Sequence, residues 1–248
     1  MRITWLGHAT VVIETAGGRL VTDPVLRTHI VHLRRHAAEP GLSERVDAAL
    51  LSHLHHDHFD PPSLRKLGAP VVAPPGTRSA LRRLGLAAFE LAPGDDLEIG
   101  GAHVTAVRAV HDGRRWPIGA RRDDDAIGFV VEAGGQRVYF AGDTALFDGM
   151  RDLGPLDVAL VPIWGWGTKL GPGHMNPGEA AAAIALLRPA IAVPIHWGTF
   201  LPIGRHRRHS HVLRDPADAF RERSAKAAPD VRIEILEPGG SLDITRAG

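Results

Sequence analysis

Residues 48–58 read Ala48-Ala49-Leu50-Leu51-Ser52-His53-Leu54-His55-His56-Asp57-His58, so an apolar run passes directly into a histidine-rich tract with one aspartate. The apolar run has the composition of a buried strand. Residues at i and i+2 of an extended chain point to the same side, so His53 and His55 present their imidazoles to one point. Where the strand gives way to a helix the chain turns, which aims Asp57 and His58 at a second point nearby. This geometry predicts a site for two metal ions.

Ligand-type residues also end other expected strands. His111, Asp143 and His196 each follow an apolar, strand-like run. Open sheets of the α/β type place their sites at the carboxyl ends of strands, so these side chains are expected to join the histidine tract. The alternative interpretation of the tract is a surface cluster or an adventitious metal-binding segment. His56 is the spacer of the tract, and we predict that it does not bind metal.

Composition restricts the chemistry of the site. The chain of 248 residues is 44% hydrophobic and 23% charged, as in ordinary soluble globular proteins. Cysteine is absent and histidine numbers 15, so any metal must be held by nitrogen and oxygen. The net charge of +1, with one short basic cluster at residues 205–209, gives no electrostatic reason to expect a nucleic-acid or membrane partner. The expected partner is a small-molecule or lipid-like substrate, and a homo-oligomer is left open.

No stretch predicts insertion into a membrane or export. No apolar run approaches the roughly 20 residues of a membrane-spanning helix, and the amino terminus lacks the pattern of a secretory signal. We therefore expect no integral membrane association and a cytoplasmic location.

Short strand-like runs alternate with helical patterns on both sides of residue 120 and predict a layered sandwich of the α/β (α+β) class in a single domain, residues 1–248. Asp60 and Asn176, each followed by proline, are expected helix N-caps. The aspartate-rich segment 121–125 is interpreted as a solvated loop. The expected strands are 10–14, 19–22, 48–52, 70–73, 103–110, 127–132, 137–141, 158–162, 191–194 and 231–236, and the expected helices are 61–67, 77–84, 176–187 and 216–227.

In their order along the chain, these motifs resemble the metallo-β-lactamase superfamily of binuclear metal hydrolases over nearly the whole sequence. The resemblance rests on Asp23 in Val21-Thr22-Asp23-Pro24, the histidine tract, His111, the turn Gly142-Asp143-Thr144 and His196. Four phrases resemble the branch with the N-acyl-phosphatidylethanolamine phospholipase D-like enzymes and the ascorbate phosphate lactonase-like proteins. They are Thr4-Trp5-Leu6-Gly7-His8-Ala9-Thr10, Phe140-Ala141-Gly142-Asp143-Thr144, His174-Met175-Asn176-Pro177-Gly178-Glu179-Ala180 and Ile195-His196-Trp197-Gly198-Thr199-Phe200.

The resemblance implies a four-layer αββα sandwich and a complete set of metal ligands. His53, His55 and His111 would hold the first metal, Asp57, His58 and His196 would hold the second, and Asp143 would bridge them. Imidazole and carboxylate ligands suit two zinc ions, with manganese or iron as alternatives.

A mechanism follows from two metals about 3.5 to 4 Å apart, which can lower the pKa of a water held between them. The resulting bridging hydroxide is the expected nucleophile. Asp57 is expected to orient it and then pass a proton to the leaving group. Asp23 is expected to accept a hydrogen bond from a ligand imidazole. For His8 two interpretations are left open, support of the ligands or packing at a strand end, and we do not count it as a ligand.

Further residues are expected around the substrate. In the branch resembled, a histidine at the position of His174 lies beside the substrate, where it would stabilise negative charge or act as an acid; the alternative is a hydrogen bond at the start of a helix. Trp164, Trp166 and Lys169 lie in a glycine-rich loop and are candidates for substrate binding, although tryptophan can simply anchor such a loop. The remaining histidines are expected in exposed loops, where they would shape the entrance: His29, His32, His36, His206, His209 and His211.

The leading hypothesis is hydrolysis of a phosphodiester or a cyclic ester. The alternatives are a lactonase acting on a phosphorylated sugar acid, a di-iron oxidoreductase and a metal-binding protein without turnover. His55 stands where the di-iron relatives resembled have glutamate, which argues against redox chemistry. The absence of a basic face argues against RNA processing.

Overall fold

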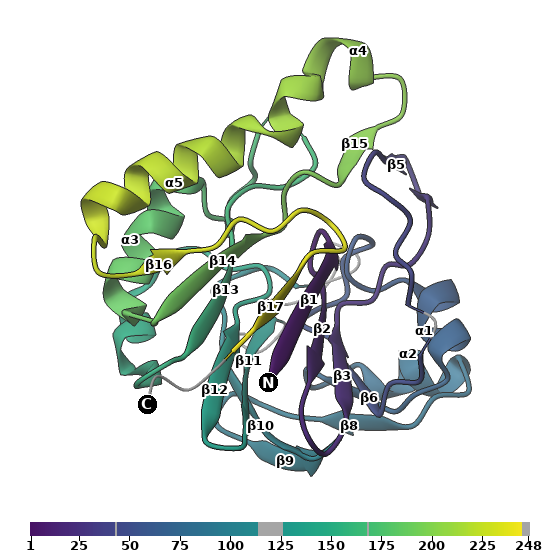
Figure 1. The fold of residues 1–248 in the computed structure, drawn as a ribbon. Coiled ribbons are helices and arrows are strands. Elements are labelled where there is room, and N and C mark those ends of the chain that lie inside the picture. The colour runs from purple at the N-terminus through teal and green to yellow at the C-terminus, as the bar shows by residue number, and fades with distance from the viewer. Residues whose placement is uncertain (43, 114–125, 168, 245–248) are drawn as a thin grey trace.

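Two seven-stranded sheets pack face to face in the computed structural model, which describes residues 1–42, 44–113, 126–167 and 169–244 (Figure 1). In the first sheet, β17, β1, β2 and β3 are antiparallel, whereas β3, β6, β7 and β8 are parallel. Its strands, in spatial order, are β17 (Ser241–Asp243), β1 (Arg2–Gly7), β2 (Thr10–Glu14), β3 (Arg19–Thr22), β6 (Ala48–Leu50), β7 (Val71–Ala73) and β8 (Ala88–Glu90).

The second sheet also has a parallel and an antiparallel half. Strands β16, β14, β13 and β12 are parallel, and β12, β11, β10 and β9 are antiparallel. In spatial order they are β16 (Arg232–Ile233), β14 (Ile191–Ile195), β13 (Val158–Pro162), β12 (Gln136–Phe140), β11 (Ile127–Ala133), β10 (Ala102–Arg108) and β9 (Asp96–Ile99). A small antiparallel sheet beside them consists of β15 (Phe200–Pro202), β5 (Leu33–Arg35) and β4 (His29–Ile30).

Helices cover the outer face of each large sheet, which gives the four layers that the sequence predicts (Figure 1). On the first sheet these are α1 (Pro61–Leu67) and α2 (Arg78–Arg83), and on the second they are α3 (Pro177–Leu187) and α5 (Asp215–Ala227). Shorter pieces are α4 (His206–His209) and the 3₁₀ helices η1 (Asp148–Leu153) and η2 (Ser210–Leu213). No helix in the described ranges is long and apolar enough to cross a membrane.

The alternation of side chains along β6 shows how the core divides. Ala48 and Leu50 belong to the cluster between the sheets, whereas Ala49 and Leu51 belong to the cluster beneath α1 and α2. This is the period of two that a strand imposes. Both faces of β6 are therefore buried, as the apolar run predicts, and the residues that follow it begin from a fixed position.

The two predicted N-caps are confirmed. Asp60 accepts a hydrogen bond from the Ser63 backbone N–H, and Asn176 forms a reciprocal capping box with Glu179. Each cap is followed by proline at the first helical position, where the missing N–H costs nothing.

One predicted strand is largely wrong. Of residues 231–236, only Arg232–Ile233 pair as a strand, at the edge of the second sheet. The chain must then cross to the first sheet, where the Gly239 N–H donates to the Trp5 carbonyl (2.6 Å). The prediction for segment 121–125 falls outside the described residues.

Candidate metal centre

The predicted ligands meet at one edge of the sandwich, and they come from both sheets. The histidine tract follows β6 of the first sheet, whereas His111, Asp143 and His196 follow β10, β12 and β14 of the second. After β6 the chain turns, and the backbone N–H groups of His58 and Phe59 both donate to the His55 carbonyl (3.1 and 2.8 Å).

Three imidazoles form the first cluster, defined as His53, His55 and His111, with ligand atoms within 4.8 Å of one another. His111 donates from Nδ1 to the Gly173 carbonyl (2.8 Å), which leaves Nε2 facing His55 Nδ1 at 3.1 Å. His53 Nδ1 is 2.9 Å from Ser52 Oγ, so its Nε2 also faces the cluster. Each ring thus has a nitrogen free to bind a cation.

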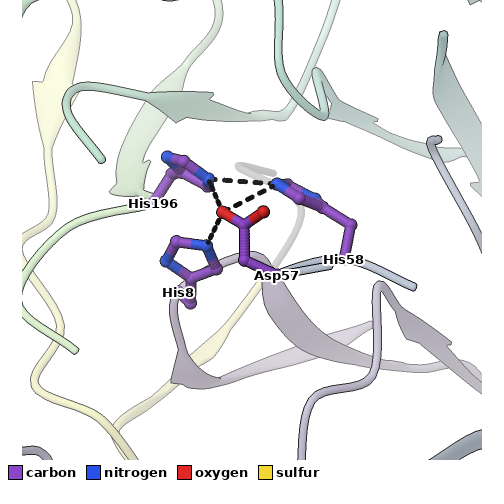
Figure 2. A group of neighbouring side chains, drawn as sticks. All are labelled: His8, Asp57, His58 and His196. Carbon is purple, nitrogen blue, oxygen red and sulfur yellow. Dashed lines mark hydrogen bonds and ion pairs between the residues drawn. The ribbon is translucent and has the colours of Figure 1, made fainter. Parts of the chain in front are cut away.

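Asp57, His58 and His196 form the second cluster, and His8 also brings a ring nitrogen within 4.8 Å of their ligand atoms (Figure 2). The Nε2 atoms of His58 and His196 lie 3.0 Å apart, and Asp57 Oδ2 lies 3.7 and 3.5 Å from them. Their Nδ1 atoms are occupied elsewhere. His196 donates to the Trp164 carbonyl (2.8 Å), and His58 donates to Asp23 Oδ2 (2.7 Å).

Asp143 lies between the two clusters. Its Oδ1 is 3.2 Å from His196 Nε2, and its Oδ2 is 3.2 Å from His58 Nε2 and 3.9 Å from His53 Nε2. The preceding Gly142 has a φ of 60°, and a Cβ there would lie 2.7 Å from the Cβ of Ser52. Glycine is therefore required in this turn, which brings the carboxylate within reach of both clusters.

These residues fit a metal centre. The buried atoms His53 Nε2 and Asp143 Oδ1 have no hydrogen-bond partner among the described residues. Buried polar atoms without partners are rare and costly, so two at one site indicate a missing ligand. Imidazole nitrogen and carboxylate oxygen, with no thiolate, suit zinc, manganese or iron.

The electrostatics of the site favour bound cations. Burial opposes a charge on Asp143, but His196 and His58 outweigh it and hold its pKa well below the usual range. Burial and the neighbouring His58 lower the pKa of His53 well below its ordinary value. An ionised carboxylate and a neutral imidazole are the states in which these groups bind metals.

Asp23 is fully buried behind the second cluster. It accepts hydrogen bonds from the Ser52 backbone N–H (2.7 Å), Ser52 Oγ (2.6 Å) and His58 Nδ1. Burial opposes a charge on His58, but Asp143, Asp23 and Asp57 outweigh it and raise its pKa well above the ordinary value, so without a metal His58 holds a proton that a bound ion would displace. Asp23 thus lies where a carboxylate that orients a ligand imidazole must lie.

His8 contacts the second cluster directly (Figure 2). Its Nε2 is 2.9 Å from Asp57 Oδ2, and its ring lies on that of His196 with centroids 3.9 Å apart. Burial and then His196 lower its pKa to about 3, so the ring is neutral. His8, Asp23 and His196 have φ values of 54°, 34° and 61°, a region that non-glycine residues rarely adopt. Such strain persists only where the surroundings enforce it.

A cavity of about 410 Å³ opens onto both clusters. Two of the predicted substrate residues, Trp166 and Lys169, line it, and so does His174, whose Nε2 is 3.3 Å from Asp143 Oδ2. Burial opposes a charge on His174, but Asp143 raises its pKa to about 9. Trp164 does not line this cavity: its indole donates to the Gly167 carbonyl (2.9 Å), and its own carbonyl accepts from His196.

The β4–β5 hairpin forms a wall of the cavity that sequence reasoning missed. Ile30, Val31 and Leu33 line it, as does His32, which lies edge-on to Trp166 with centroids 5.0 Å apart. No strand periodicity marks so short a hairpin. Several rim histidines also lie in secondary structure rather than in loops: His29 is in β4, and His206 and His209 are in α4.

A family model and a similar protein each match most of this chain. Residues 18–197 match the family described as "Beta-lactamase superfamily domain". The chain is 34% identical over 254 residues to a "UPF0173 metal-dependent hydrolase" of Methanosphaerula palustris, with 98% of this chain and 100% of that protein covered.

Two solved structures share the fold. One is Igni18, described as a metallo hydrolase from Ignicoccus hospitalis, with a TM-score of 0.74 at 22% identity over 97% of each chain. The other is CmlA, described as a diiron beta-hydroxylase from Streptomyces venezuelae, with a TM-score of 0.71 at 20% identity over 97% of this chain and 53% of that chain. At these identities the likeness concerns the fold alone.

Proposed function

Since the chain belongs to the beta-lactamase superfamily and, within it, to the UPF0173 metal-dependent hydrolases, we propose that it is a binuclear hydrolase that cleaves a phosphodiester or a cyclic ester. The observation that carries the proposal is the pair of donor clusters with the Asp143 carboxylate between them.

Two metal ions, zinc before manganese or iron, would be held by the two clusters. The first would receive His53, His55 and His111, the second Asp57, His58 and His196, and both would share Asp143. When bound, such ions supply a water of lowered pKa and polarise a carbonyl or phosphoryl oxygen. The donor atoms already face one another with their other nitrogens occupied, so little rearrangement is needed to bind.

Asp57 is the proposed proton carrier. Its carboxylate lies at the cavity and is held by the hydrogen bond from His8 Nε2. Burial opposes its charge, but His58, His196 and His8 hold its pKa well below the usual range, so it begins as the acceptor. It would take a proton from the attacking water and pass it to the leaving oxygen.

His174 is the proposed electrostatic partner of the reacting group. It lines the cavity with its Nε2 3.3 Å from Asp143 Oδ2, and in its protonated form the ring is a cation. A cation beside the reacting atoms stabilises the negative charge that develops on a carbonyl or phosphoryl oxygen.

The cavity lining supports a substrate with an apolar substituent. Ile30, Leu33, Trp166 and Leu170 contribute most of the wall away from the clusters. Such a wall suits a lipid-like or aromatic group better than a sugar. Lys169 is the observation that favours the second candidate, a lactonase acting on a phosphorylated sugar acid, because an exposed ammonium at the rim can bind a phosphate.

Turnover assays test the proposal. The metal-loaded protein, assayed against bis(4-nitrophenyl) phosphate and a panel of lactones, should hydrolyse at least one of them, and an Asp143→Ala variant should not. Elemental analysis of protein purified without added metal should find close to two ions per chain. Absence of turnover on every substrate would contradict the proposal, and stoichiometric iron without hydrolysis would favour an oxidoreductase.

A further inference from the structure

Charge is segregated in this chain in a way that the net charge of +1 conceals. Segments 24–38 and 197–214 together contain seven arginines and no aspartate or glutamate. The rest of the chain therefore has 22 basic residues against 28 acidic ones. Two stretches far apart in the sequence thus have the same sign of charge while the remainder has the opposite sign.

The fold brings these two segments together. Strands β4 and β5 come from the first segment, and β15 and α4 come from the second. Leu201 of β15 pairs with Arg34 of β5, and the Ile203 backbone N–H donates to the His32 carbonyl (2.9 Å). The small sheet and α4 project at the top of Figure 1, beyond the two large sheets.

Four of the seven arginines are exposed around this projection, and we call them the tip arginines: Arg34, Arg205, Arg207 and Arg208. None of them forms an ion pair with a carboxylate in the described ranges. The others are engaged elsewhere. Arg27 binds Asp60, Arg35 is buried and donates to backbone carbonyls, and Arg214 lies beside Asp215 and Asp218 in another cavity.

Two exposed aliphatic side chains belong to the same two segments as the tip arginines. Val31 is 68% exposed and Ile203 is 59% exposed, and the next large hydrophobic side chain among the described residues, Phe89, is 41% exposed. Val31 also has a φ of 50°, which is strained for a β-branched residue and would suit asparagine or glycine. Neither exposure nor strain at this turn benefits folding.

We propose that the β4–β5 tip, with Val31 and Ile203 flanked by the tip arginines, docks on the surface of an anionic lipid bilayer. Each arginine near such a surface contributes favourable attraction, and aliphatic side chains enter the boundary between headgroups and acyl chains. Exposed aliphatic groups in the same segments as the arginines favour a bilayer over a nucleic acid, which would be met by aromatic or polar side chains.

Docking through the tip would also determine where the cavity lies relative to the bilayer. The same hairpin lines the cavity above the metal clusters through Ile30, Val31 and Leu33. A docked molecule would therefore hold the mouth of the cavity at the lipid surface, where apolar substrates concentrate. This binding goes beyond the hydrolysis proposed above and does not require turnover.

Co-flotation with vesicles tests the proposal on the full chain. The fraction of wild-type protein that floats should be about tenfold larger with vesicles containing roughly one third phosphatidylserine than with vesicles of phosphatidylcholine alone. Binding to the anionic vesicles should weaken as salt is added. The triple variant Arg205→Glu/Arg207→Glu/Arg208→Glu should bind the anionic vesicles about a hundredfold more weakly. Ile203→Asp should bind about tenfold more weakly, because it removes the aliphatic group and adds repulsion.

A matched control separates the tip from net charge. Arg65→Glu/Arg82→Glu/Arg83→Glu makes the same change of charge at exposed positions of α1 and α2, and it should bind within about threefold of wild type. Equal losses in the two triple variants would overturn the proposal, as would full binding by Ile203→Asp or tighter binding to single-stranded RNA than to anionic vesicles. Turnover of a soluble substrate should be unchanged in both triple variants. The turnover assay therefore tests the proposed hydrolysis independently of vesicle binding.

Discussion

The two donor clusters are neighbours but are supported differently. In the first, His53 and His111 are held directly by neutral partners, the Ser52 hydroxyl, which in turn donates to Asp23, and the Gly173 carbonyl. In the second, His58 rests on the buried carboxylate of Asp23, and Asp57 adds a charge of its own. A carboxylate behind an imidazole makes it a better ligand, so the second cluster is expected to hold its ion more tightly and release it last to a chelator.

The largest effect is expected where the clusters meet. Asp143→Ala removes the carboxylate within reach of both, so both ions should be lost or weakened, and kcat/KM should fall by about a thousandfold or more. Metal content and kinetics on the same preparation measure this. Asp148→Ala removes an exposed carboxylate and should change neither. Two tightly bound ions in Asp143→Ala would show that the carboxylate is not shared.

Asp23→Ala tests the difference in support. It leaves His58 Nδ1 and two donors of Ser52 without their acceptor, so affinity for one ion should fall about 10- to 100-fold. The free energy of unfolding should also fall by about 2 to 3 kcal/mol. Chelator titrations and urea unfolding measure the two effects. If the Asp23→Ala variant instead binds both ions with the affinities of wild type, the two clusters are not supported differently.

His8→Phe should have a smaller effect. It preserves a ring against His196 but removes the hydrogen bond to Asp57, so kcat should fall about tenfold while two ions stay bound. Steady-state kinetics with metal analysis distinguish this from loss of a ligand. Release of one ion would mean that His8 is itself a ligand of the second cluster.

The smallest effect is expected from the spacer of the histidine tract. His56→Ala should retain both ions, because His56 belongs to neither cluster. His58→Ala, two residues away, should lose one ion. Elemental analysis of the two variants is sufficient, and the opposite result would place the ligands in a different register.

Much of the candidate site follows from local rules. The alternation of a strand separates His53 from its neighbours, and apolar runs mark the strands before Asp143 and His196. Trp164 shows where such rules end. A glycine-rich loop is recognisable from composition, but which way its indole points depends on contacts made after folding, and here the carbonyl of Trp164, not its ring, serves the site.

By itself, the sequence predicted a layered sandwich of strands and helices and the ends of the strands at which candidate donor residues lie, because strand periodicity and helix caps act over a few residues; the four layers and the complete ligand set came from the family resemblance. Only the tertiary structure decided which carboxylate supports which imidazole, which wall closes the cavity and where the arginines gather. These contacts join Asp23 to His58 and Arg34 to Leu201, residues far apart in the sequence, and no local pattern specifies such pairs. The histidine tract thus predicts a metal centre. The difference between the hydrogen-bond partners of the two clusters arises from packing.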